Sequence, residues 1–260
     1  MRRRLITCLA VVMVAVTATA QAAVTPIPPD QFPPGCDPNG EALQGDAAND
    51  SMDGTPQRDL LRGGDGIDLI HGFGDSDCLA GQGGLFDDID GGTGPDQITG
   101  GLGADRLRGG KGDDAVRGDR DDDALGGDQG RDLLIGDGGD DQIHGDEGRD
   151  QIKGGRGADR LFGQAAADSI TGGKGRDEVS GSDGNDAIQG GKRDDDLEGA
   201  LGNDSIWGGA ANDTIDGGKG NDRIRDLRGR NQVSCGQGVD RVVTNEKSEV
   251  AANCEQVTRR

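Results

Sequence analysis

The chain has 260 residues and a formal net charge of −21 at pH 7, with 49 acidic residues against 28 Lys and Arg. It contains 51 Gly but one Trp, no Tyr and four Phe, which excludes a large apolar core. So acidic a chain repels phosphates, which excludes nucleic acid as a partner and favours cations. Two kinds of structure remain: a disordered chain, or a repeat fold with one thin apolar stripe.

Residues 1–23 have the layout of a secretory signal peptide. Arginines at 2–4 precede an apolar run at 5–16, and Ala20-Gln21-Ala22 is a small-x-small cleavage site, with Ala18-Thr19-Ala20 as a second candidate. A membrane anchor is the alternative, but the apolar run is too short to span a bilayer comfortably. We therefore expect a secreted, extracellular protein that has no transmembrane segment after signal cleavage.

The segment that follows, residues 24–35, is rich in proline. Five prolines stand in the nine positions 26–34. Because proline fixes the backbone in extended conformations, this composition predicts a linker.

A nine-residue period begins at Gly45 and is plainest from Gly91, where the sequence reads GGTGPDQIT GGLGADRLR GGKGDDAVR. The frame holds for 22 blocks with one ten-residue block at 81–90, and the eighth place is aliphatic in all of them. The sixth place is Asp in every block from Asp50 to Asp222; Asn231 is the exception and Asp240 resumes the series. Compositional disorder does not enforce such a pattern, so the period favours a solenoid.

Each block alternates a glycine-rich turn with a three-residue strand. Glycine density excludes helix, and the period of two in a strand turns the eighth residue inward. We expect two blocks per coil, so that the turns of every second block stack along each edge. The extra residue near Leu85 and Phe86 is predicted to bulge from its turn without changing the strand order.

The nonapeptide resembles the RTX, or hemolysin-type, calcium-binding repeat, G-G-x-G-x-D-x-U-x. The resemblance implies an all-β fold, a parallel β-roll, with multiple Ca²⁺ ions between stacked turns, held by sixth-place Asp carboxylates and backbone carbonyls. In the blocks that keep Gly at the fourth place, the ligands it implies are Asp68, Asp96, Asp105, Asp114, Asp132, Asp141, Asp150, Asp159, Asp177, Asp186, Asp204 and Asp222.

The chemistry of the residues agrees with that role. Calcium takes six to eight oxygen ligands, which carboxylates and carbonyls supply, and glycine lets a turn adopt positive φ. One aliphatic side chain in each block cannot offset the conformational entropy of ordering that block, and stacked carboxylates repel one another. We therefore expect calcium binding and folding to be one event.

Some turns depart from the pattern. The blocks that begin at 118, 163, 190 and 208 lack the fourth-place Gly, and block 226 lacks its opening glycines and its Asp. Three of those four, and block 226, fall on the edge that starts with block 100, which we call the second row; the first row starts with block 91. We expect unequal calcium rows, with the second poorly occupied from about residue 190 onward.

Four cysteines follow the signal peptide, and an even number in an exported protein suggests two disulfides. Cys235 with Cys254 encloses a short loop at one end. Cys36 with Cys78 flanks the other, but strict coil register separates them by about 10 Å, beyond disulfide reach, unless the N-terminal segment folds back.

The period divides the chain into five parts. After the signal peptide and the linker, we expect a degenerate N-terminal cap at 36–62, a calcium-binding β-roll at 63–243 and a C-terminal cap at 244–260, with disulfide-stapled ends.

No catalytic motif accompanies the repeats. The sequence has no H-E-x-x-H zinc motif, no G-x-S-x-G elbow and no phosphate-binding loop. Adjacent acidic residues such as Asp113 and Asp114 could resemble the paired carboxylates of a glycosidase, but the nine-residue repeat explains the position of every such pair. We predict a non-enzymatic, exported calcium-binding protein. Two alternatives stay open: a calcium-dependent adhesion or surface-matrix scaffold with a cell-surface or polysaccharide partner, and an accessory module of a separate extracellular enzyme.

Overall fold

The structure is a computed structural model that describes residues 25–27, 36 and 39–260. The predicted signal peptide and most of the predicted linker lie outside the described residues. Within the described part of the chain all regular structure is β-strand. No helix there is long and apolar enough to cross a membrane.

The strands form two long sheets, of 14 and 12 strands. The 14-stranded sheet comprises β1 (Thr25–Pro26), β2 (Ala42–Gln44), β4 (Leu60–Gly64), β6 (Cys78–Gln82), β8 (Gln97–Gly101), β10 (Ala115–Arg120), β12 (Leu133–Gly138), β14 (Gln151–Arg156), β16 (Ser169–Lys174), β18 (Ala187–Lys192), β20 (Ser205–Ala210), β22 (Arg223–Asp226), β24 (Arg241–Thr244) and β26 (Gln256–Arg259). The 12-stranded sheet comprises β3 (Ser51–Asp53), β5 (Leu69–Gly74), β7 (Asp88–Thr93), β9 (Arg106–Lys111), β11 (Ala124–Gln129), β13 (Gln142–Glu147), β15 (Arg160–Ala165), β17 (Glu178–Asp183), β19 (Asp196–Leu201), β21 (Thr214–Asp216), β23 (Gln232–Ser234) and β25 (Glu249–Val250).

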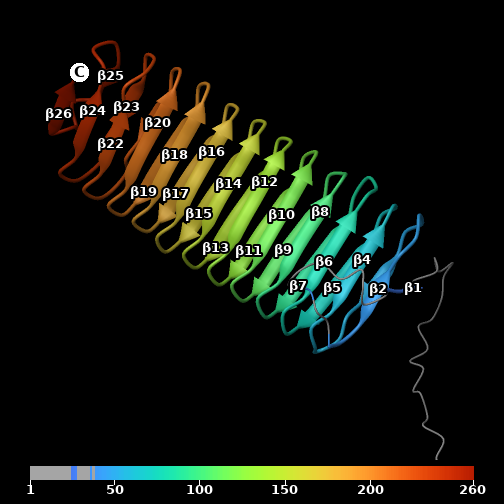
Figure 1. The fold of residues 1–260 in the computed structure, drawn as a ribbon. Coiled ribbons are helices and arrows are strands. Elements are labelled where there is room, and N and C mark those ends of the chain that lie inside the picture. The colour runs from blue at the N-terminus through green and yellow to red at the C-terminus, as the bar shows by residue number, and fades with distance from the viewer. Residues whose placement is uncertain (1–24, 28–35, 37–38) are drawn as a thin grey trace, which may run out of the picture.

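From β2 onward, consecutive strands alternate between the two sheets, so two blocks make one coil. Val116 of β10 pairs in parallel with Leu134 of β12, and Leu134 pairs with Ile152 of β14, in each case with the same place two blocks further along the chain. The coils stack into a rod in which colour runs from the N-terminal to the C-terminal end (Figure 1). This is the predicted parallel β-solenoid.

The core consists of the aliphatic side chains that both sheets turn toward each other, one row from each sheet. All the eighth-place residues, from Met52 to Val242, are at most 3 % exposed. The residues on either side of each point outward, as in β13, where Gln142 is exposed and Ile143 is buried. The predicted inward aliphatic residue is confirmed, but the predicted three-residue strand is too short: most strands continue into the next block, as in β13, where Gly145 is buried as well.

The ten-residue block leaves the strand order unchanged. Across it the pairing skips one residue, since Leu69 of β5 pairs with Asp88 of β7. The extra length is taken up in the turn, where Leu85 is 80 % exposed and Phe86 40 %. The predicted bulge is confirmed.

The N-terminal end of the rod is covered by a segment that folds back. β1 pairs with β2 antiparallel, against the direction of the other strand pairs. Ile27 and Cys36 are buried against Leu60 and Cys78, which stand at outward-pointing seventh places. The fold-back places Cys36 on the outer face of the sheet and not two coils away from Cys78, as strict coil register would. Cys36 therefore forms a disulfide with Cys78, at a Cα–Cα distance of 5.8 Å.

Strand pairing continues beyond residue 243. β25 and β26 extend the two sheets, with Val250 opposite Val233 and Val257 opposite Val242. Each of these pairs joins residues that are separated by less than two full blocks, so these last steps fall outside the repeat frame. The disulfide between Cys235 and Cys254 closes this end, with a Cα–Cα distance of 5.2 Å.

Candidate metal centre: two rows of buried aspartates

The sixth-place aspartates stack along each edge of the rod. The backbone amide of Asp96 donates a 2.8 Å hydrogen bond to Oδ1 of Asp114, and the amide of Asp114 donates equally to Oδ1 of Asp132. The first row comprises Asp59, Asp77, Asp96, Asp114, Asp132, Asp150, Asp168, Asp186, Asp204, Asp222 and Asp240. The second comprises Asp50, Asp68, Asp87, Asp105, Asp123, Asp141, Asp159, Asp177, Asp195 and Asp213, with Asn231 at its end.

Most of the row carboxylates have one oxygen without a partner. From Asp68 onward, Oδ2 of every row aspartate is buried and makes no hydrogen bond. The side chains are at most 3 % exposed from Asp59 onward. A buried carboxylate oxygen without a donor is costly, and the repetition of this feature from Asp68 to Asp240 is what a row of cation sites would require.

Backbone oxygens share the space that the unpaired carboxylate oxygens face. A Cβ atom on Gly91 would stand 2.5 Å from Oδ2 of Asp96 and 2.5 Å from the carbonyl oxygen of Gly109 on the next coil. Glycine is therefore required at position 91, where two oxygens approach the same Cα. Such an all-oxygen setting suits a hard cation.

Burial raises the pKa of most row carboxyl groups from the usual 3.8, Asp68 and Asp96 among them. The pKa reaches about 8 for Asp96, about 7 for Asp132 and about 6 for Asp150. Desolvation is the largest cause, the hydrogen bond from a backbone amide opposes it, and for Asp96 the charges of Asp114 and Asp77 add to it. Without a cation, the row carboxyl groups with raised pKa values therefore keep their protons to a higher pH than exposed aspartates do.

Acidic side chains stack in file along the rows and do not gather around one point. In the described residues, no group of three or more His, Cys, Asp or Glu side chains could hold a metal ion. Any cation between the turns therefore takes most of its ligands from backbone carbonyls, for which calcium is suited.

The sequence matches the RTX calcium-binding nonapeptide repeat, in its four-copy form, at residues 53–85, 90–125, 117–152, 126–161, 153–188 and 189–224. These matches cover more than half of the chain. The chain belongs to this family. Comparison with curated proteins gives no match.

All the aspartates that sequence analysis assigned as RTX calcium ligands lie in the two rows. Asp68, Asp105, Asp141, Asp159 and Asp177 belong to the second row, and Asp96, Asp114, Asp132, Asp150, Asp186, Asp204 and Asp222 to the first. Each is at most 2 % exposed. The structure therefore gathers them as the RTX pattern requires, at stacked turns rather than at one point.

The rows contain further aspartates that the assignment left out. Asp77, Asp87, Asp123, Asp168, Asp195, Asp213 and Asp240 have the same buried, unpartnered Oδ2. Most had been set aside because their blocks lack the fourth-place Gly. Their sixth-place position alone was the signal that could have found them.

Turns without the fourth-place glycine keep a positive φ at that place, but at smaller angles than the 122° of Gly94 or the 144° of Gly112. Asp121, Ala166, Arg193 and Ala211 stand at that place with φ of 71°, 85°, 82° and 98°. Left-handed backbone costs a residue with a Cβ about 1–2 kcal/mol, so these turns hold their shape under strain. Loss of glycine therefore weakens the turn without removing the aspartate from its row.

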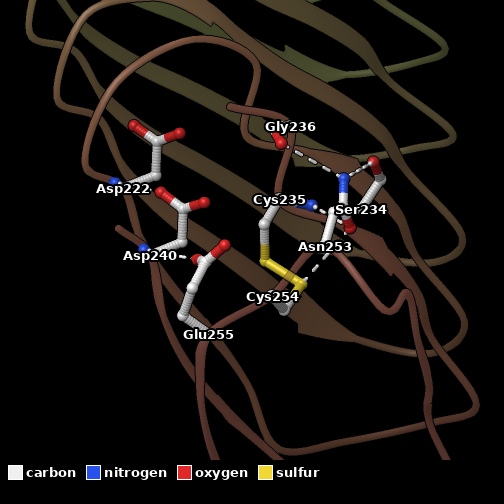
Figure 2. The surroundings of a disulfide bond; sticks show 8 residues. All are labelled: Asp222, Ser234, Cys235, Gly236, Asp240, Asn253, Cys254 and Glu255. Carbon is white, nitrogen blue, oxygen red and sulfur yellow. Dashed lines mark hydrogen bonds between the residues drawn. A yellow bond between two sulfur atoms is a disulfide. The ribbon is translucent and has the colours of Figure 1, made fainter. Parts of the chain in front are cut away.

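The two rows end differently. In the first row the amide of Asp240 donates to Oε2 of Glu255 at 3.0 Å, so Glu255 takes the place of a further row aspartate (Figure 2). The preceding residue, Cys254, is tied to Cys235. In the second row Asn231 ends the series, and its Nδ2 donates to the carbonyl of Arg228 and to Ser248 Oγ.

Proposed function

We propose that this RTX repeat protein is exported, has no catalytic activity, and folds into its β-roll as it binds multiple Ca²⁺ ions along both edges. The observation that carries the proposal is the row of buried Oδ2 atoms, repeated on every coil and facing carbonyl oxygens. A divalent cation would neutralise two stacked carboxylates, offset their mutual repulsion and supply the missing partner.

The ligands of these ions would be the sixth-place aspartates assigned above, together with backbone carbonyls of the same turns. We place the calcium-binding region at 63–243, between an N-terminal cap at 36–62 and a C-terminal cap at 244–260. The paired strands β25 and β26 support the second cap, because they close the sheets without adding nonapeptides.

Export is supported by the charged, apolar and small-residue segments of residues 1–23 and by both disulfides, which form in oxidising compartments. Extracellular calcium would then trigger folding after translocation. Mass spectrometry of protein from the culture medium tests this part: a mature chain that begins just after the cleavage site supports export, and an intact N-terminus in the cell contradicts it.

A calcium titration of the metal-free mature chain tests the folding part. Circular dichroism should show strand content rising cooperatively with calcium, and a chelator should reverse it. Fluorescence of Trp207, the one tryptophan of the chain, should change over the same calcium range. Magnesium is the control, because it demands octahedral geometry and gives up its water reluctantly. Full strand content in chelator at pH 8 would contradict the proposal.

A further inference from the structure

The end of the second row carries a carboxylate that the repeat pattern does not provide. In block 226 the sixth place is Asn231 instead of Asp, and the first place is Asp226 instead of Gly. The turn has lost one negative charge and gained another. Asp226 is 1 % exposed, although it lies in a position where the preceding turns of this row have no side chain.

The geometry of the preceding coil shows what Asp226 replaces. A Cβ atom on Gly190 would stand 2.5 Å from Oδ2 of Asp195 and 2.7 Å from the carbonyl oxygen of Gly208. A Cβ atom on Gly208 would stand 2.6 Å from Oδ2 of Asp213 and 2.3 Å from Oδ2 of Asp226. A carboxylate oxygen thus occupies the place that a carbonyl oxygen has one coil earlier.

Asn231 replaces only one of the two oxygens that a row aspartate has. Its Oδ1 accepts the hydrogen bond from the Asp213 amide at 3.1 Å, as a row aspartate would. Its other terminal atom is a donor, and it is satisfied by the Arg228 carbonyl at 2.8 Å and Ser248 Oγ at 3.2 Å. Asn231 therefore leaves no oxygen in need of a cation.

Asp213 and Asp226 do leave such oxygens. Oδ2 of each is buried and no N–H or hydroxyl group donates to it, the two carboxyl groups interact directly with each other, and both oxygens face the Cα atom of Gly208. Two ionised carboxylates cannot remain so close in a buried space unless a cation or a shared proton lies between them.

We propose that Asp213 and Asp226 form a divalent-cation site at the C-terminal end of the second row, in which Asp226 supplies from the first place the carboxylate that Asn231 lacks at the sixth. This inference rests on the proposed calcium-binding function, and it departs from the family pattern, which has glycine at that place. The occupant is calcium, because the neighbouring turns offer the same oxygen ligands. The site would extend the second calcium row to its last turn. At that turn we therefore expect bound calcium, whereas the sequence alone predicted poor calcium occupancy from about residue 190 onward.

Trp207 makes this site measurable. It is the only tryptophan, the chain has no tyrosine, and it directly precedes Gly208 on β20. Tb³⁺ bound in place of calcium emits when excited through a nearby indole. Excitation of Trp207 should therefore report on the turns around Gly208 more strongly than on turns far along the rod.

The experiment compares the full mature chain with three variants. Asp226→Asn removes the proposed carboxylate, and Asp222→Asn removes one from the first row on the same coil. A double variant, Asp226→Gly with Asn231→Asp, restores the family residues at the first and sixth places and leaves Leu227 at the second. Calcium stoichiometry by equilibrium dialysis and Trp207-sensitised Tb³⁺ emission are measured for each, and circular dichroism in calcium checks that each variant is folded.

We expect Asp226→Asn to bind one calcium ion fewer than the parent and to lose more sensitised emission than Asp222→Asn, and we expect the double variant to recover both. Unchanged stoichiometry and emission in Asp226→Asn would overturn the inference in favour of a proton shared by the two carboxyl groups. Failure of the double variant to recover would show that Asp226 does not stand in for a sixth-place aspartate. If the parent chain binds no calcium, the proposed function is overturned as well. If the parent binds calcium and Asp226→Asn has no effect, only the site at Asp213 and Asp226 is overturned.

Discussion

The backbone amide of Asp114 donates a 2.8 Å hydrogen bond to Oδ1 of Asp132, while Oδ2 of Asp132 is buried without a partner. The hydrogen bond to Oδ1 joins neighbouring coils and needs no metal ion. The second oxygen is not satisfied by any protein donor. The same side chain thus takes part in the fold and leaves one oxygen for a cation, which supports the proposal that calcium binding and folding are one event.

Acidification should stabilise the metal-free fold. The pKa of Asp96 is about 8 and that of Asp132 about 7 in the folded chain, against 3.8 when exposed, so the folded state binds more protons between these values. The stabilising contribution is fully present below about pH 4 and is lost as pH rises through about 6 to 8. In chelator, strand content and the thermal midpoint should therefore be higher at pH 5 than at pH 8, as followed by circular dichroism.

Calcium should invert that dependence. Bound calcium requires ionised carboxylates, so protons compete with it and the calcium midpoint should rise as pH falls from 8 to 5. A calcium midpoint independent of pH would contradict the assignment of the row carboxylates as ligands.

Asp114→Asn should have opposite effects with and without calcium. In calcium the variant should bind at least one ion fewer and need a higher calcium concentration to fold, because an amide oxygen is a weaker ligand than a carboxylate. In chelator it should be more stable than the parent, because a buried charge is gone. Isothermal titration calorimetry and thermal unfolding measure the two effects.

Asp113→Asn is the matched control for that variant. Asp113 is exposed, and its Oδ1 accepts a 3.0 Å hydrogen bond from the Arg131 amide, which an asparagine oxygen can still accept. Its calcium stoichiometry should equal that of the parent. Equal losses in both variants would point to overall charge rather than to the rows.

Glycine at strained fourth places should stabilise the calcium-bound rod. Ala211 has a φ of 98° and Ala166 a φ of 85°, so Ala211→Gly and Ala166→Gly should each raise the free energy of unfolding by about 1 kcal/mol. Denaturant unfolding in saturating calcium is the measurement.

The reverse change should be destabilising. A Cβ on Gly130 would stand 1.6 Å from the Gly112 carbonyl oxygen, so Gly130→Ala should lower the free energy of unfolding by more than about 1 kcal/mol. Stabilisation by this change, or destabilisation by the two changes to glycine, would show that the fourth place is not under backbone strain.

Loss of the C-terminal disulfide should loosen the end of the first row. Cys254 holds Glu255 beside Asp240, and the crosslink closes a short loop that contributes about 3 kcal/mol by chain entropy (Figure 2). In the Cys235→Ser, Cys254→Ser double variant, hydrogen exchange should accelerate in β24 and β26 and stay unchanged in β12. Unchanged exchange at that end would mean that strand pairing alone secures the cap.

The regular part of the fold could be predicted from the sequence because each block has one inward residue. Ile143 and its equivalents defined the core, and the sixth-place aspartates defined both rows, since neither depends on contacts outside the repeat. The N-terminal fold-back was predicted only as a condition of the disulfide. Apolar Leu60 at an outward place is the sequence signal for the covered face.

The irregular ends could not be predicted in detail. β25 and β26 pair across steps that are shorter than two blocks, so the repeat frame does not reveal them. Asp226 was missed because it stands where the pattern has glycine, and only the stacked coil shows that its carboxylate takes the place of a carbonyl oxygen.

Crystals grown in saturating calcium, with diffraction recorded at a wavelength where calcium scatters anomalously, test the central claim most directly. The account predicts anomalous peaks spaced along both edges, each beside an Oδ2 atom that has no protein partner. A rod with the same fold and no anomalous peaks along its turns would contradict it.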